Sequence, residues 1–501
     1  MSRAAAVAAV GASLAVAILA LATRGSGSGA EDQTAALWLR VFPEQRSQLF
    51  QRGAIGLSIE TSQLTSEVIT AKDRSLVALM RRLGPATLRV GGNSADRAWW
   101  TAGAEAKPEW ATSSLTPVDL ERLRQLLDAA GWRAVLTVNL GHFDPRRAGS
   151  EAQAAARILG PRLKAIEIGN EPNAFGTSGK RLRKPTYGVG DYLRELDVYR
   201  AHIEASAPGV ELAGPDLSFA PSSHVWLPEI AAVDPSPFRE FTHHYYSTAY
   251  NLPDGRCAPT PLPTARELLV PAVREYEDTV IARLTSAGAI AHRPTVFSET
   301  NTTTSCNAAG GPDTSPVFAS ALWALDWSLR AASAGVSGLN FHGKFGHCSA
   351  YSFSPICIPR GSRSQHPLPR PVYSGLLAAT YLEGGRFTRV ELGGAQAEGG
   401  NITAYATRRR NGKLTLAVID FLPRGRTSIA ISASGYAAAS TRLLRAPSIH
   451  ARGGIWFGGK PLGPGGSLRP PATPLKHEDG AFRLPLRAGT AQIVTLKPAR
   501  R

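Results

Sequence analysis

Two glutamates, Glu171 and Glu299, carry the chemistry that this sequence suggests most directly. Glu171 lies in the stretch IEIGNEPN (residues 166–173), and Glu299 lies in the stretch FSETN (residues 297–301). Each follows a short apolar run that is typical of a buried strand, where an acidic side chain is costly to place unless it has partners. Hydrolysis of a glycosidic bond requires two such carboxyl groups. One protonates the leaving oxygen, and the other attacks the anomeric carbon or activates water.

The neighbours of the two glutamates suggest which role each one plays. We expect Glu171 to be the acid/base and Glu299 the nucleophile, because Asn170 offers an amide to the sugar 2-hydroxyl beside Glu171. His244 and Tyr246 can donate hydrogen bonds to the nucleophile and help to keep it ionised. A carboxyl separation of about 5–5.5 Å would give double displacement with retention of configuration. The alternatives are a solvated helix-starting turn at Glu171 and a simple strand-end cap at Glu299.

Eight short apolar runs that alternate with helical patterns must position these side chains. The predicted strands cover residues 54–60, 86–90, 133–140, the run that leads into Glu171, 210–214, 241–246, 295–299 and 338–342. The predicted helices cover residues 73–83, 117–130, 151–159, 191–205, 268–287 and 317–334. This alternation predicts an α/β fold with a closed parallel sheet, the (β/α)8 TIM barrel.

Polar residues recur where the predicted strands end. These ends carry Glu60, Asn93, Asn139, Asn170, Glu171, His244, Tyr246, Glu299 and His342. Because the active sites of such barrels lie at the C-terminal ends of the strands, this clustering is more specific than any single motif. Arg89, which precedes the Gly91-Gly92 pair, can add positive charge beneath the nucleophile.

From about residue 381 the helical spacing gives way to short alternating strands. They are predicted at residues 402–407, 414–420, 427–432 and 491–496. With turns between them, they predict a C-terminal antiparallel β-sandwich domain. We therefore divide the chain into a signal or anchor with its linker (1–30), a segment that can lend a strand to the sandwich (31–52), a catalytic barrel (53–380) and the β-sandwich (381–501).

The N-terminus and the cysteines indicate an exported protein. Residues 4–22 are apolar and follow a basic residue, which is the pattern of a secretory signal. We expect cleavage and a secreted or cell-surface protein; retention as a membrane anchor is the alternative. Four cysteines then predict two disulfides, and of the three pairings we favour Cys257–Cys306 with Cys348–Cys357. No CxxC or HxxxH spacing supports a metal site, so we predict neither a metal nor a cofactor.

The chain is strongly basic. Its net charge is +17, with 56 Lys and Arg against 39 Asp and Glu. A basic exported protein could meet acidic polysaccharides or anionic lipid; the alternative is basic residues spread over the surface. The run 408–410 is three arginines followed by Asn-Gly, which is typical of a hairpin tip, and no nucleic-acid motif is present. We predict an acidic sugar, not a nucleic acid, as the partner, and the oligomeric state stays open.

Four motifs resemble one known family. They are LRVGGNSAD (88–96), IGNEPNAF (168–175), HHYY (243–246) and the Glu299 strand followed by Gly310-Gly311. Together they resemble glycoside hydrolase family 79, a clan A family of retaining glycosidases that contains β-glucuronidases and heparanase. The resemblance spans about residues 56–385. It implies a barrel with a β-sandwich, and a β-glucuronide or acidic oligosaccharide as the substrate.

The resemblance also implies roles for residues around the sugar. Family members bind the uronate carboxylate with the backbone N–H groups of a glycine pair and with a tyrosine hydroxyl. The matching residues here are Gly310, Gly311 and Tyr351, with Phe353 as the alternative match for the tyrosine. Glu60 and Asn93 match positions that contact sugar hydroxyls.

The chain departs from the family pattern around the expected carboxylate pocket, in an insertion that bears Cys306 and in the loop 348–357. With the N-terminal segment, the resemblance predicts an exported retaining glycoside hydrolase that cleaves β-glucuronides. Two alternatives stay open: a clan A hydrolase for another β-glycoside, and a non-catalytic binder of acidic polysaccharide. The pair of Glu171 and Glu299 argues against the binder, which has no need of both carboxylates.

Overall fold

The computed structural model describes residues 37–177, 179–248, 264–303, 314–348, 353–359, 364–394, 401–463 and 470–499. The predicted signal segment, the Cys257–Cys306 pair, Gly310, Gly311 and Tyr351 lie outside these residues. Within the described ranges, none of the helices has the length and apolar character needed to span a bilayer. In the same ranges, no group of three or more His, Cys, Asp or Glu side chains is arranged to hold a metal ion.

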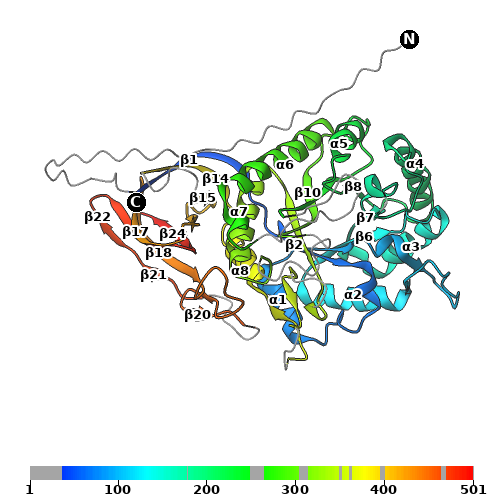
Figure 1. Ribbon diagram of the computed structural model, residues 1–501, viewed down its shortest axis with the longest axis horizontal. Coiled ribbons are helices and arrows are strands. Elements are labelled where there is room, and N and C mark those ends of the chain that lie inside the picture. Colours follow the sequence, from blue (N-terminus) through cyan, green and yellow to red (C-terminus); the bar gives the residue numbers. More distant parts are fainter. Residues whose placement is uncertain are drawn as a thin grey trace, which may run out of the picture. The chain divides into compact units, whose positions relative to one another are not determined.

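Eight parallel strands close into a barrel in the order β10-β11-β2-β3-β6-β7-β8-β9 (Figure 1). They are β2 (Ile55–Glu60), β3 (Thr87–Gly91), β6 (Arg133–Val138), β7 (Leu163–Ile168), β8 (Leu212–Leu217), β9 (Glu240–Tyr246), β10 (Thr295–Asn301) and β11 (Gly338–Gly343). These strands are buried along most of their length, which is why their sequences are short apolar runs without strict alternation. The predicted TIM barrel is confirmed.

Helices follow the barrel strands and surround them (Figure 1). They are α1 (Arg74–Leu83), α2 (Pro117–Ala130), α3 (Pro145–Leu159), α4 (Val189–Ser206), α5 (Ser223–Ala231), α6 (Pro271–Ile290), α7 (Ala319–Ser333) and α8 (Pro371–Ala379). The sequence patterns predicted six of these helices but not α5 or α8. α5 buries one face, but Pro228 lies inside it, and proline is unfavourable in the interior of a helix. Every residue of α8 is buried, so that segment shows no amphipathic period of 3.6 residues. Two short strand pairs lie in the loops, β4 (Ala98–Trp100) with β5 (Ser113–Leu115) and β12 (Ile356–Cys357) with β13 (Leu368–Pro369).

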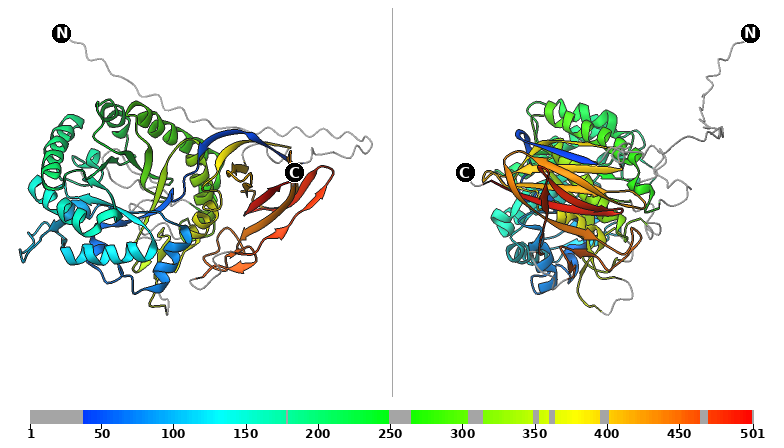
Figure 2. Two further views of the ribbon diagram at one scale, coloured as in Figure 1. Left: turned by 180° about the vertical axis from the view of Figure 1, so that it is seen from behind. Right: turned by 90° about the vertical axis from the view of Figure 1, so that its left-hand side faces the viewer.

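The C-terminal strands form one further sheet. Its strands are β1 (Trp38–Leu49), β14 (Arg386–Gly393), β15 (Ile402–Arg408), β16 (Leu414–Asp420), β17 (Arg426–Ala433), β18 (Tyr436–Arg445), β19 (Trp456–Phe457), β20 (Lys460–Pro461), β21 (Thr473–Pro474), β22 (Lys476–Glu478), β23 (Ala481–Arg487) and β24 (Thr490–Pro498). Most neighbours are antiparallel. The exception is β1, which pairs antiparallel with β14 and parallel with β17. Figure 2 shows β1 in blue among the yellow and orange strands of this sheet.

This sheet packs against itself as a sandwich and against the barrel domain. Leu416 and Val418 of β16 share one hydrophobic cluster with Ile429 of β17, although the two strands are separated in the sheet by β15, β14 and β1. Ala417 and Ile419, on the opposite face of β16, belong to the larger cluster of the barrel and its helices. The predicted β-sandwich is therefore confirmed, and β16 is buried on both faces.

Small side chains fill the barrel interior near the N-terminal ends of the strands. Val135, Ala165 and Ala213, from three neighbouring strands, form a separate small cluster. Two residues beyond Ala165 the next inward position of β7 is Glu167. The interior is therefore apolar at one end and polar towards the C-terminal ends of the strands, where barrel enzymes place their active sites.

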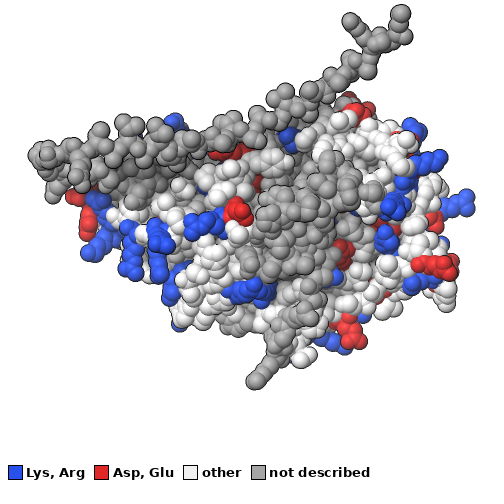
Figure 3. All heavy atoms as spheres, viewed as in Figure 1, with Lys and Arg blue, Asp and Glu red and all other residues white. Residues whose placement is uncertain are grey.

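Basic side chains lie over both regions of the protein. On the face seen in Figure 3, Lys and Arg are scattered over the barrel region and are denser over the C-terminal strands. Both regions therefore contribute to the net charge of +17.

Candidate active site

Arg89 on β3 is fully buried and binds acceptors from several other strands inside the barrel. Its Nε donates to Glu167 Oε2 at 2.9 Å, and its Nη1 donates to Glu299 Oε2 at 2.7 Å. Its Nη2 donates to Asn170 Oδ1 at 2.8 Å and forms a short ion pair with Asp216. A planar guanidinium with five N–H donors suits such a set of acceptors, which a lysine could not reach together. Burial disfavours the charge of Arg89, but the three carboxylates outweigh this and raise its pKa well above the usual value.

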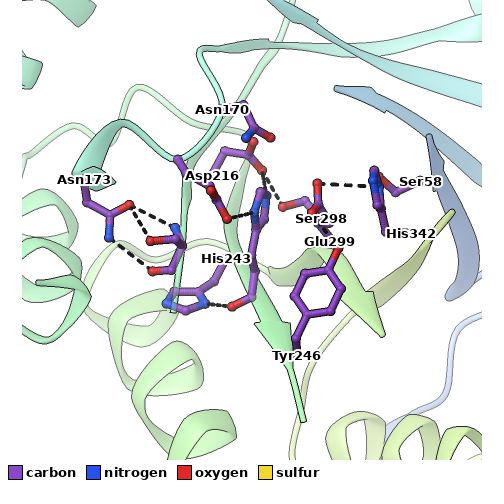
Figure 4. A network of polar contacts seen from close by, with 12 residues as sticks. Ser58, Asn170, Asn173, Asp216, His243, Tyr246, Ser298, Glu299 and His342 are labelled. Carbon is purple, nitrogen blue, oxygen red and sulfur yellow. Dashed lines mark hydrogen bonds and ion pairs between the residues drawn. The ribbon is translucent and has the colours of Figure 1, made fainter. Parts of the chain in front are cut away.

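Glu299, the expected nucleophile, lies in β10 with its carboxylate held from two sides. The hydroxyl of Tyr246 donates to Oε1 at 2.7 Å, while Arg89 binds Oε2. His342 Nδ1 lies 3.5 Å from the same Oε2. Figure 4 shows Tyr246 and His342 reaching Glu299 from different directions. These contacts fix the orientation of the carboxylate, as attack on an anomeric carbon requires.

Glu171, the expected acid/base, follows β7 in a left-handed backbone conformation with a φ of 55°. A residue other than glycine rarely adopts this conformation, and such strain gathers at functional sites. Its N–H donates to the backbone oxygen of Asp216 at 3.0 Å, which joins the ends of β7 and β8. Its Oε1 lies 3.1 Å from His244 Nδ1, and its Oε2 lies 3.2 Å from Lys180 Nζ. The side chain of Glu171 is 17% exposed, so a substrate can reach it.

The surroundings of Glu171 favour its ionised form. Burial by itself would raise the pKa of Glu171, but the charges and hydrogen bonds of Lys180 and His244 lower it to about 2. A general acid is expected to have a raised pKa. The arrangement therefore differs from the expectation of a protonated Glu171. The largest cause of the lowered pKa is Lys180, a cation that the sequence motifs did not reveal, and His244 adds to it.

His244 joins Glu171 to Asp216. Its Nε2 lies 2.8 Å from Asp216 Oδ1, while its Nδ1 contacts Glu171. Burial would lower the pKa of His244, but the neighbouring carboxylates, Asp216 first, raise it to about 10. The sequence placed both His244 and Tyr246 on the nucleophile Glu299. Of the two, only Tyr246 contacts Glu299, because the His244 ring lies between the carboxylates of Glu171 and Asp216.

Asp216 is a central residue that the sequence motifs missed. Burial would raise the pKa of Asp216, but Arg89 and His244 lower it well below its usual range. Ser298 Oγ also donates to its Oδ1 at 2.6 Å (Figure 4). Asp216 lies just beyond the predicted end of the fifth strand at residue 214, and an acidic residue at a strand end is the signal that could have identified it.

Asn170 is held by its backbone and its side chain. Its side-chain Oδ1 accepts from Arg89, and its backbone N–H donates to Asp96 Oδ2 at 3.1 Å. Its backbone oxygen accepts from Lys180 Nζ at 2.7 Å. Because Arg89 occupies Oδ1, the side-chain amide presents its NH2 group as the donor for a further partner.

Glu60 at the end of β2 forms a second polar corner of the site. Its Oε2 accepts from the backbone N–H of Ser94 at 2.9 Å, and His342 Nε2 lies 3.7 Å from its Oε1. Burial would raise the pKa of Glu60, but His342 and Ser94 lower it to about 2. Asn93, the predicted sugar ligand, is exposed in the turn after β3, and the side chain that contacts Glu60 belongs to its neighbour Ser94. Gly92 has a φ of +73°, and a Cβ atom there would lie 2.6 Å from the Glu60 carboxyl group.

The predicted disulfide Cys348–Cys357 is present and lies close to this site. Phe353, between the two cysteines, packs edge-on against Tyr246 with ring centroids 5.8 Å apart. Its backbone oxygen accepts from Asn301 Nδ2 at 3.0 Å, at the end of β10, the strand that carries Glu299. The disulfide therefore closes a loop that supports one wall of the site. The other expected carboxylate ligands lie outside the described residues.

Neither the protein-family models nor the curated proteins contain a match to this chain. Solved structures with a similar fold include a 4-O-α-L-rhamnosyl-β-D-glucuronidase from Fusarium oxysporum, with a TM-score of 0.72, 18% identity and coverage of 91% of this chain and 98% of that one. A family 51 arabinofuranosidase from Xanthomonas axonopodis pv. citri has a TM-score of 0.65 and 14% identity, covering 92% of this chain and all (100%) of that one.

CelM2, a bifunctional glucanase-xylanase from a metagenome library, is also similar, with a TM-score of 0.61, 14% identity and coverage of 93% of this chain and 99% of that one. At these identities the likeness is one of fold. Each structural match covers more than nine-tenths of this chain. The similarity in fold therefore includes both the barrel and the C-terminal sheet. The chain therefore has the fold that these glycoside hydrolases share.

Proposed function

We propose that this protein is a retaining glycoside hydrolase of the family 79 type that cleaves β-glucuronides, with Glu171 as acid/base and Glu299 as nucleophile. The observation that carries the proposal is the continuous chain of contacts from Glu299 through Arg89, Asp216 and His244 to Glu171. In the barrel, only β8 and β9 separate the strands that carry the two glutamates. Both carboxylates thus belong to one network at the C-terminal ends of the barrel strands, where the active sites of barrel enzymes lie.

In the first step of the proposed reaction, a Glu299 oxygen attacks the anomeric carbon while the bond to the leaving oxygen breaks. Glu171 gives its proton to that oxygen, so the leaving group departs as an alcohol. The product is a glycosyl ester of Glu299. Arg89 and Tyr246 hold the attacking carboxylate in place.

In the second step, Glu171 takes a proton from a water molecule, and the oxygen of that water attacks the same carbon from the vacated side. The ester bond breaks, Glu299 returns as a carboxylate, and Glu171 is protonated again. Two inversions give net retention. The NH2 group of Asn170, oriented by Arg89, is the donor that we assign to the sugar 2-hydroxyl.

The preference for a β-glucuronide rests on other observations. The motifs around Asn93, Asn170, His243 and Glu299 resemble family 79, and one protein of similar fold is a rhamnosyl-glucuronidase. Gly310, Gly311 and Tyr351 remain our candidates for the uronate carboxylate. We also propose that residues 1–30 direct export, so that the enzyme meets its substrate outside the cytoplasm.

A second candidate is a hydrolase for a neutral glycoside, because an arabinofuranosidase and a glucanase-xylanase share the fold over similar lengths. A panel of nitrophenyl glycosides that includes the β-glucuronide, β-glucoside, β-xyloside and α-L-arabinofuranoside distinguishes the two. We expect the highest kcat/KM on the β-glucuronide. A preference for a neutral glycoside would remove the uronate assignment and leave the two-carboxylate mechanism in place.

The roles of the two glutamates are tested by alanine variants with azide. We expect Glu299→Ala and Glu171→Ala each to lower kcat/KM by several orders of magnitude. With a nitrophenyl leaving group, azide should restore turnover of Glu171→Ala and give the β-glycosyl azide, because the small anion needs no base. Turnover of no aryl glycoside by the wild-type protein would refute the proposed function.

A further inference from the structure

The loop between β7 and α4 is strongly basic. After Glu171, residues 172–188 of this loop include Lys180, Arg181, Arg183 and Lys184 and no acidic residue. Two of these cations, Arg183 and Lys180, make different contacts in the structure. Arg183 donates to the backbone oxygens of Gly141 and Leu140 and pairs with Glu195, so it ties the loop to its neighbours, whereas Lys180 turns towards the active site.

Lys180 lies directly on the acid/base. Its Nζ is 3.2 Å from Glu171 Oε2 and donates to the backbone oxygen of Asn170 at 2.7 Å. Its side chain is 15% exposed, so the ammonium group is partly desolvated yet still reachable. By its role, Glu171 must contact the leaving oxygen of a bound substrate. A cation within hydrogen-bond reach of Glu171 therefore borders the part of the site where the leaving group binds.

This position is unfavourable for a general acid unless something else engages the cation. Lys180 and His244 keep the pKa of Glu171 at about 2. At pH 7 a carboxyl group with such a lowered pKa is almost entirely ionised. A second anion beside Lys180 would share its charge, reduce its pull on Glu171 and so favour the protonated acid.

We infer that Lys180 binds an anionic group, a carboxylate or a sulfate, on the leaving half of the substrate, and that it selects substrates with such a leaving group. This inference rests on the proposed function and extends it from the sugar that is cleaved to the group that departs. The substrate class is then a glycoside within an acidic oligosaccharide or with an acidic aglycone. Binding and proton transfer are coupled, because the anion that Lys180 recognises also releases Glu171 from its ion pair.

The test uses aryl glycosides that differ in one charge. The glycone is the one that the wild-type enzyme cleaves best, and the aryl group carries a meta-carboxylate, a meta-sulfonate or the neutral meta-carboxamide. We expect the wild-type kcat/KM to be about tenfold higher for an anionic aryl group than for the carboxamide, the order of one partly buried charge pair. Whether the carboxylate or the sulfonate is preferred identifies the anion.

Variants of the same loop provide the controls. In Lys180→Gln we expect the ratio between anionic and neutral aglycones to fall to about one, while Lys180→Arg keeps most of the preference. Lys184→Gln removes the same charge from an exposed position of the loop and should keep the wild-type ratio. Thermal melts of all three variants establish that they are folded.

A pH profile separates this role from a purely structural one. The charged groups that face Glu171 are Lys180 from its own loop and His244 from β9, with Asp216 of β8 behind His244. Loss of Lys180 raises the pKa of Glu171, so the high-pH limb of kcat/KM on the neutral substrate should move to higher pH in Lys180→Gln. A structural role alone would lower activity without moving that limb.

Two results would overturn the inference: a wild-type enzyme without preference for the anionic aglycones, or a Lys180→Gln variant that keeps the preference. Either result, with turnover still dependent on Glu171 and Glu299, leaves the proposed function standing. Absence of turnover on every glycoside would refute the proposed function, and the inference with it.

Discussion

Replacement of Arg89 by methionine perturbs the network at its centre. Arg89→Met keeps a side chain of similar length but removes the charge and every N–H donor. The guanidinium pairs with Glu167, Asp216 and Glu299, whose side chains are 0%, 1% and 9% exposed. Removal of one partner from a buried ion pair costs about 3–5 kcal/mol, because it leaves an uncompensated charge. Since three carboxylates lose the same partner, we expect the free energy of unfolding at pH 7 to fall by at least about 3 kcal/mol.

The size of this loss should depend on pH. In the wild type, the pKa of Asp216 lies below its unfolded value, so ionisation of Asp216 stabilises the fold above the ordinary carboxyl pKa. This contribution is lost only as the pH falls through the lowered folded value. Burial already raises the pKa of Glu167 to about 7 in the wild type. Without Arg89 we expect the pKa values of all three carboxyl groups to rise, which destabilises the fold as the pH rises above their unfolded values. The difference between the two proteins should therefore shrink as the pH falls from 7 to about 4.5.

Urea unfolding followed by tryptophan fluorescence at the two pH values measures this difference. The matched control is Arg194→Met, because Arg194 is 74% exposed in an ion pair on α4 and should change stability by less than about 1 kcal/mol. A loss below 1 kcal/mol for Arg89→Met at pH 7, or a difference that grows as the pH falls, would refute this view of the network.

Three further predictions concern the walls of the site. Tyr246→Phe removes one 2.7 Å hydrogen bond to Glu299 and should lower kcat by about 10²-fold with little change in stability; a loss below threefold in steady-state kinetics would contradict it. Gly92→Ala places a Cβ 2.6 Å from the Glu60 carboxyl and should raise KM, whereas an unchanged KM would show that Glu60 does not bind the sugar. Replacing both residues of the Cys348–Cys357 disulfide by serine opens a short loop and should cost about 2.5 kcal/mol in the chain-entropy model, measured by urea unfolding of the variant and the wild type without reductant. Equal unfolding midpoints for the variant and the wild type would argue against a stabilising role.

The sequence predicted the barrel well because the physical signal for each strand is local. A strand that is buried on both faces needs an unbroken apolar run, and each such run could be located without knowledge of its neighbours. The errors occur where that signal is weak. The fifth strand is predicted to end at residue 214, whereas β8 extends to Leu217, so Asp216 falls outside the predicted strand.

The contacts within the site were harder to predict, since they depend on where side chains from distant strands meet. His244 and Tyr246 both point into the barrel, and the alternation of β9 cannot tell which carboxylate each one reaches. Lys180 contacts Glu171 because the chain turns back within nine residues, and no periodic pattern marks such a return. The sequence thus indicated the residue types at the strand ends but not the pairing among them.

The most direct test of the central claim is to trap the proposed covalent intermediate. A 2-deoxy-2-fluoro-β-glucuronosyl fluoride should react once with the wild-type enzyme and form a stable ester, because the fluorine slows the second step. Peptide mapping by mass spectrometry is expected to find the sugar on Glu299, and on no peptide of the Glu299→Ala variant. A label on another carboxylate, or a hydrolysis product of inverted configuration with no label at all, would contradict the assignment of Glu299 as the nucleophile.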